Sequence, residues 1–230
     1  MRWLIDNVDV VLDLTRTHLY LSLVPLLLGM LISIPVGAAV RTVSWLRRMT
    51  LVVASVAFTI PSLALFVTIP LIAGLQVLDP LNVVIALTVY STALLVRAVP
   101  EALDSVSPAV VDAATAMGFG RIRRSVAVEL PLALPVLVAN IRVVAVTNIS
   151  MVSVGSVIGI GGLGQLFTQG YQRDYPDQIL AGIIAIVFLA LVFDALLFLL
   201  GRALTPWTRA GSTRIGKTTS RRRTTDRTSA

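Results

Sequence analysis

The sequence predicts an all-α integral membrane protein with five transmembrane helices, six being the alternative, and one long cytoplasmic loop. Of its 230 residues, 56% are hydrophobic and only 13% are charged, whereas a soluble domain carries about 25% charged residues. Five stretches reach the roughly 20 apolar residues that a helix needs to cross a bilayer. The lack of cysteine excludes disulfides and thiolate metal sites.

The predicted spans cover residues 19–40, 51–75, 81–99, 132–158 and 179–200. The second contains Pro61 and Pro70, so it is either one kinked span or a span followed by a half-helix. Both prolines are expected to face protein, because each frees a backbone carbonyl that lipid cannot satisfy.

The spans divide the chain into three regions. Residues 1–18, which carry three aspartates and look like a short amphipathic helix, are expected to be extracytoplasmic. Residues 19–200 form the transmembrane domain. Residues 201–230 are expected to be a disordered, basic cytoplasmic tail that is attracted to anionic lipid headgroups rather than to nucleic acid.

Arginine sorts to one side of the membrane when five spans are assumed. That side collects Arg41, Arg47, Arg48, Arg97, Arg121, Arg123, Arg124 and the tail from Arg202. The other side holds three arginines and six aspartates. The positive-inside rule therefore predicts a plasma or inner membrane protein with its N-terminus outside and its tail in the cytoplasm, and an even number of spans would lose this sorting.

The cytoplasmic loop at about 97–131 is expected to contain two short helices. Ser107 suits an N-cap, and Gly118 suits a position after the helix end where φ is positive, which predicts a helix at 108–117. A second short helix at 121–129 is expected to end near Pro131. Such a loop could lie on lipid headgroups or dock a soluble partner.

One face of the first predicted helix carries apolar side chains, namely Val110, Val111, Ala114 and Met117.

The stretch "DAATAMG…VELP" resembles the EAA motif of ABC-importer permeases, in which E-A-A, three residues, Gly, nine residues and I-x-L-P follow one another. The matching residues are Asp112, Ala113, Ala114, Gly118, Val128, Leu130 and Pro131. Asp112 replaces glutamate and Val128 replaces isoleucine, both conservatively. The resemblance extends over about residues 15–200.

This resemblance implies a type I permease subunit whose loop inserts a coupling helix into a separate ATPase. It implies two ATPase subunits, a second permease subunit, identical or related, and an extracytoplasmic solute-binding protein. No cofactor and no catalytic activity are expected on this chain. The segment from "IGIGGLGQ" to "FDALL" is similar to permeases for osmoprotectants such as glycine betaine, carnitine, choline or proline. Another small solute, such as methionine, is the alternative.

Two patterns that suggest nucleotide binding fail in their context. "GSTRIGKT" at 211–218 matches a P-loop, but no apolar strand precedes it and no amphipathic helix follows. "GIGGLG" at 159–164 matches a dinucleotide fingerprint but ends a membrane span. Its glycines are expected to allow a turn at the outer surface or close helix approach.

Two charged residues lie well inside the predicted spans, away from their ends. Arg142 and Asp194 sit at similar depths, about 15 Å and 10 Å above the inner ends of their helices. The sequence predicts an ion pair between the fourth and fifth spans, with gating or pathway lining as the alternative.

The other intramembrane polar residues are assigned to structural roles. Asn140 and Asn148 are expected to join helices, and His18 is expected at the outer interface. No constellation of catalytic or metal-binding side chains is visible in the sequence.

Two other classes of protein compete with the importer hypothesis. A secondary transporter driven by an ion gradient should show internal repeats, which are absent, although the broken second span is compatible with one. A membrane scaffold with a partner-recruiting tail would leave the EAA-like spacing unexplained.

Overall fold

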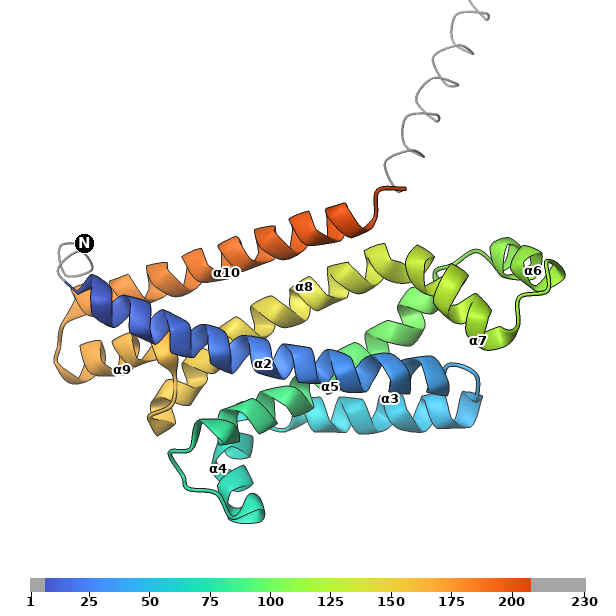
Figure 1. The fold of residues 1–230 in the computed structure, drawn as a ribbon. Helices are drawn as coiled ribbons and strands as arrows, with labels where there is room; N and C mark the ends of the chain where they lie inside the picture. The colour runs from blue at the N-terminus through green and yellow to red at the C-terminus, as the bar shows by residue number, and fades with distance from the viewer. Residues whose placement is uncertain (1–6, 208–230) are drawn as a thin grey trace, which may run out of the picture.

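The computed structural model describes residues 7–207, and its regular structure is helical throughout this range. In chain order it consists of α2 (Val8–Val40), α3 (Ser44–Thr59), α4 (Ser62–Ala73), α5 (Pro80–Asp104), α6 (Pro108–Ala116), α7 (Arg121–Arg124), η1 (Ser125–Glu129), α8 (Leu130–Gly155), η2 (Ser156–Ile158), η3 (Gly162–Gly164), α9 (Gln165–Gln172) and α10 (Pro176–Leu204). The long helices run roughly side by side, with α6 and α7 at one end of the bundle and α9 at the other (Figure 1).

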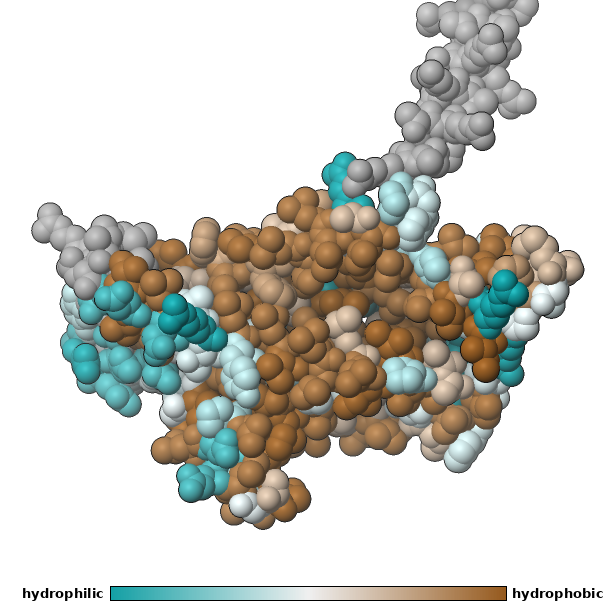
Figure 2. Space-filling view, in the orientation of Figure 1, coloured by the Kyte–Doolittle hydropathy of each residue, from teal (hydrophilic) through white to brown (hydrophobic). Residues whose placement is uncertain are grey.

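The predicted all-α membrane fold is confirmed. Four helical stretches are long and apolar enough to cross a membrane: α2, α5, the run from Arg121 to Ile158, and α10. The bent pair α3 and α4 makes a fifth if it counts as one span. Figure 2 shows the matching surface, a broad hydrophobic band between hydrophilic patches at the two ends.

The second predicted span is not a straight helix. α3 and α4 meet at an angle of 99° across residues 60–61, and α3 begins at Ser44, before the predicted start of the span. Pro70 is buried as expected, but Pro61 is exposed. The expectation was wrong for Pro61. The free carbonyl at the bend is that of Ile60, and it accepts a hydrogen bond from the hydroxyl of the buried Tyr90. Because this carbonyl is satisfied, the ring of Pro61 itself does not need to face protein.

α5 is the central helix, and α2, α3, α4 and α8 all pack against it. Glycines in α2 set the closest approach. A Cβ built at Gly29 would lie 2.5 Å from the Cβ of Ser91, and one at Gly37 would lie 2.7 Å from the Cβ of Val99. Small residues at such contacts let helices associate closely in a membrane, where van der Waals packing drives their association.

Asn148 joins three helices, as the sequence predicts. Its side-chain amide donates to the hydroxyl of Ser91 on α5 at 2.8 Å and to the carbonyl of Ser22 on α2 at 3.2 Å. Asn140 does not join helices, because its amide donates to the carbonyl of Val136 one turn earlier in α8.

His18 lies in the protein interior. It is fully buried, and its Nε2 lies 2.9 Å from the carbonyl oxygen of Ile149 on α8. The helix begins well before residue 19, the predicted start of the first span. α2 already starts at Val8, which places His18 under the Gly-rich turn.

The Gly-rich segment forms that turn. Gly162 has φ of +46°, and a Cβ there would lie 2.7 Å from the Cβ of His18. "GIGGLG" therefore provides a tight turn and a close helix contact, as predicted, and no strand accompanies it among residues 7–207. The P-loop-like pattern at 211–218 lies outside the described residues.

We predict that Gly29→Val lowers the stability of the fold by about 1–3 kcal/mol, because the added side chain would push α2 away from the backbone of Ser91. Leu31→Val, at an exposed position of the same helix, is the matched control. Thermal unfolding of the two purified variants in detergent checks this. Equal melting temperatures would show that the α2–α5 contact tolerates a side chain.

Candidate functional site

The predicted loop helix is present as α6, and its end has the expected geometry. Ser107 occupies the N-cap position, although its side chain makes no capping hydrogen bond. Gly118 has φ of +84°, as predicted. The N–H of Phe119 donates to the carbonyl of Ala114 and the N–H of Gly118 to that of Thr115, which is the Schellman arrangement that ends a helix and turns the chain sharply.

The apolar face predicted for this helix is divided in the structure. Ala114 is buried and Val111 packs against the cluster around Leu103. Val110 and Met117 are exposed, Met117 to 71%. α6 thus uses part of this face to attach to its own chain, through α7 and η1, and leaves the rest uncovered.

The residues of the EAA-like motif therefore separate into two sets. Asp112, Ala113 and Gly118 are exposed on the loop. Ala114 is buried, so it allows close packing within this chain and does not present a surface to a partner. Val128, Leu130 and Pro131 are half-buried where the loop enters the membrane domain.

The expectation that the second loop helix ends near Pro131 was wrong. α7 continues through η1, one turn of π-helix, into α8. The N–H of Leu130 donates to the carbonyl of Ser125, five residues earlier. Proline lacks an N–H and its ring crowds the carbonyl four residues before it. A wider π turn just ahead of Pro131 relieves both problems, and such turns are common at functional sites.

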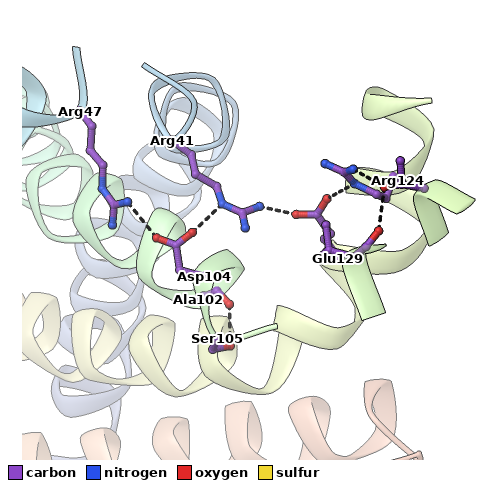
Figure 3. A network of polar contacts seen from close by, with 9 residues as sticks. Arg41, Arg47, Ala102, Asp104, Ser105, Arg124 and Glu129 are labelled. Carbon is purple, nitrogen blue, oxygen red and sulfur yellow. Dashed lines mark hydrogen bonds and ion pairs between the residues drawn. The ribbon is translucent and has the colours of Figure 1, made fainter. Parts of the chain in front are cut away.

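A buried carboxylate holds this loop against the membrane helices. Glu129 is only 1% exposed, and its Oε1 accepts a hydrogen bond from Nε of Arg124 at 2.8 Å. Its Oε2 accepts from Nη1 of Arg41 at the end of α2 (Figure 3). Two guanidinium groups thus neutralise one buried acid, as an ion in such a position requires.

The same network extends to α3, α5 and α6. Asp104 at the end of α5 accepts from Nε of Arg41 at 2.7 Å and pairs with Arg47 of α3 at 2.9 Å (Figure 3). Arg124 also donates to the hydroxyl of Thr115 on α6 at 2.7 Å. We call Arg41, Arg47, Asp104, Arg124 and Glu129 the loop-end charge network.

The two carboxylates beside Arg41 favour its charged form. Burial alone would lower the pKa of the Arg41 guanidinium, but hydrogen bonds from it to Glu129 and Asp104 outweigh burial and raise its pKa above the ordinary value. A polar cavity of about 160 Å³ adjoins the network, between the end of α2 and the start of η1.

The intramembrane charges also come together. Nε of Arg142 donates to Oδ1 of Asp194 at 2.8 Å, and Nη2 donates to Oδ2 at 2.6 Å. This bidentate contact joins α8 to α10, the two helices named in the prediction. Among residues 7–207, no group of three or more His, Cys, Asp or Glu is placed to hold a metal ion.

Sequence reasoning missed the residues that anchor the loop, Glu129 above all. Glu129 fills the variable position of the "VELP" match, and Arg41 and Asp104 end membrane helices, where charged residues are ordinary. A carboxylate two residues before a proline, within an otherwise apolar run, was the available signal, since an acid there needs a partner.

A membrane bundle with such a loop is typical of transport permeases, and comparison of the chain with known proteins identifies its family. Residues 27–210 match the model of the binding-protein-dependent transport system inner membrane component. The chain belongs to this family, as the EAA-like motif predicts. It is a multi-pass inner membrane permease, the non-catalytic component of an ABC transporter that works with an ATPase and a binding protein.

Individual relatives cover nearly the whole chain. The osmoprotectant import permease protein OsmW of Salmonella typhimurium is 36% identical over 211 residues, which are 90% of this chain and 97% of that protein. The glycine betaine/carnitine/choline transport system permease protein OpuCB of Bacillus subtilis is 28% identical over 207 residues, 90% and 94% of the two chains. Among solved structures, a chain of the MetNI methionine ABC transporter in an inward-facing conformation matches with a TM-score of 0.73 and 25% identity, over 82% of this chain and 93% of that one.

We predict that Glu129→Gln destabilises the loop end of the bundle by about 2 kcal/mol or more, because Arg41 and Arg124 would lose their shared buried anion. Glu101→Gln breaks only an exposed pair with Arg97 and should cost about 0.5 kcal/mol or less. Thermal unfolding and the rate of proteolytic cleavage between residues 104 and 121 check this. Equal behaviour of the two variants would contradict the anchoring role of Glu129.

Proposed function

We propose that this chain is the permease subunit of an ATP-driven importer for osmoprotectants such as glycine betaine, carnitine, choline or proline. The observation that carries the proposal is the 36% identity to an osmoprotectant import permease over 90% of this chain and 97% of the relative. Permeases named for glycine betaine, carnitine and choline also match over most of their lengths, which supports the same class of solute.

The ATPase is proposed to bind the exposed part of the loop. Asp112 and Ala113 are exposed on α6, Met117 is exposed directly after it, and Ile122 is exposed on α7. Met117 and Ile122 are large apolar side chains outside the membrane domain, and exposed apolar patches of this kind mark protein–protein contacts. The neighbouring Arg121 and Arg123 would favour an acidic rim on the partner.

The complete transporter is proposed to contain two permease subunits, identical or related, two ATPases and an extracytoplasmic solute-binding protein. The distribution of charge supports the orientation. Arg41, Arg47 and α7 lie at the end of the bundle that carries the loop (Figures 1 and 3). The positive-inside rule assigns that end, and the tail that follows α10, to the cytoplasm. No cofactor is proposed for this chain.

Uptake of labelled glycine betaine into salt-stressed cells, with and without this chain and in a host that lacks other importers, tests the solute class. We expect uptake to depend on the chain and to fall when unlabelled choline, carnitine or proline competes. Uptake that is unchanged by deletion would overturn the osmoprotectant assignment. Competition by methionine alone would move the assignment to an amino acid.

The energy source separates the importer from an ion-gradient-driven transporter. In proteoliposomes that contain the complete complex, uptake should require ATP inside and persist when an ionophore dissipates the ion gradient. Loss of uptake with the ionophore, at constant ATP, would favour the secondary transporter instead.

We predict that Gly118→Ala raises the number of ATP molecules hydrolysed per solute imported. A side chain at φ of +84° costs about 1 kcal/mol, so the turn that leads from α6 to α7 would change. Gly120→Ala is the matched control, because it adds the same methyl group in open space at φ of −66°. Coupling that is equally normal in both variants would show that the loop turn does not control the ATPase.

A further inference from the structure

The Arg142–Asp194 pair lies where a membrane protein cannot leave charges facing lipid. Arg142 is halfway along α8, yet the two side chains are 29% and 32% exposed. Charges at this depth face a protein partner or a water-filled space, because hydrocarbon cannot solvate them. The exposed side of the pair therefore belongs to the interior of the assembled transporter.

A hollow of about 410 Å³ opens beside the pair. It is lined by Ala139, Arg142, Val143, Val146, Thr147 and Asp194. Its volume falls in the range of sites that hold small molecules. Its walls are apolar apart from one threonine hydroxyl and the two charged groups, so the charges would dominate recognition of any solute there.

An aromatic ring completes the set of groups. The guanidinium carbon of Arg142 lies 5.0 Å from the ring centroid of Phe198, one turn beyond Asp194 on α10. Phe198 is 46% exposed, and one face of its ring lies against the Arg142 guanidinium, which a solute cation would replace there. A cation acceptor, an anion acceptor and a π-face thus occur within one cluster, and a π-face attracts quaternary ammonium groups.

We propose that Arg142, Asp194 and Phe198 form a transit site for a zwitterionic solute that carries a carboxylate and a quaternary ammonium. Arg142 binds the carboxylate through its two-pronged guanidinium, while Asp194 and the ring of Phe198 receive the ammonium. The inference rests on the osmoprotectant function proposed above and adds the residues that recognise the solute on its way through the membrane.

An arginine and an aspartate that pair with each other in the absence of solute suit such a site, because both can exchange this contact for one with the solute. When the zwitterion enters, each protein charge leaves its partner for the opposite charge of the solute. The number of ion pairs rises from one to two, and the net charge of the site stays zero throughout. No uncompensated charge is created in the membrane, which avoids the large cost of an unpaired ion. The internal pair competes with the solute, so binding remains weak enough for onward release.

Binding to the purified permease–ATPase complex, without the solute-binding protein, tests the site directly. Saturation-transfer NMR can detect weak binding of glycine betaine, a zwitterion, and of choline, a cation without a carboxylate. We expect the wild-type complex to bind both. Arg142→Gln should weaken glycine betaine binding about tenfold or more relative to choline, whereas Asp194→Asn should weaken both.

Removing one charge can destabilise the contact between α8 and α10, and weak binding could then reflect misfolding. A second pair of variants therefore leaves both charges in place. Phe198→Leu keeps the ion pair and should weaken glycine betaine binding severalfold. Phe188→Leu, at an exposed position of the same helix, should have no effect. Absence of binding to the wild type, or binding that none of the site variants changes, overturns the transit site.

The outcomes for the two proposals are separate. Wild-type uptake of osmoprotectants together with failure of the NMR test leaves the importer function standing and makes Arg142–Asp194 a purely structural contact. Failure of wild-type uptake overturns the osmoprotectant function itself, whatever the NMR test finds.

Discussion

The buried carboxylate of Glu129 is the interaction on which the loop end of the bundle depends. An acid with 1% exposure requires partners, and Arg41 and Arg124 supply them from elements far apart in the sequence. Arg41 in turn holds Asp104 at the end of α5. An apolar contact tolerates sliding of one helix along another, whereas forked guanidinium groups satisfy their carboxylates in few arrangements. The network therefore fixes the register of the helix ends from which the loop projects.

Hydropathy was enough to predict the membrane class and the approximate spans, because lipid imposes a minimum length of apolar helix. It could not predict where α3 turns into α4. That bend is stabilised by the Tyr90 hydroxyl, which comes from another helix and satisfies the carbonyl of Ile60. The rules for proline could not predict that the helix continues through Pro131. They describe a regular α-helix, whereas here a π turn precedes the proline.

The candidate site was predictable where local backbone chemistry or depth in the membrane determines it. Gly118 was assigned a positive φ because only glycine adopts it without strain, and the structure has it. Arg142 and Asp194 were paired from depth alone, because few partners exist inside a membrane. Glu129 and Arg41 are separated by 88 positions and lie at a boundary where charges are common. No short-range pattern distinguishes such a pair from solvated residues.

α8 connects the two charged clusters mechanically. At its loop end it is continuous with η1 and α7, which carry Glu129 and Arg124, and halfway along it carries Arg142. A displacement of α6 that preserves the network must carry the ends of α2 and α8 with it, because Thr115, Arg124, Glu129 and Arg41 form one bonded chain. α10 packs on α8, α9 and η3, and its Asp194 pairs with Arg142 of α8. Force applied at the loop would therefore reach α10 through its contacts with α8, which include the Arg142–Asp194 pair.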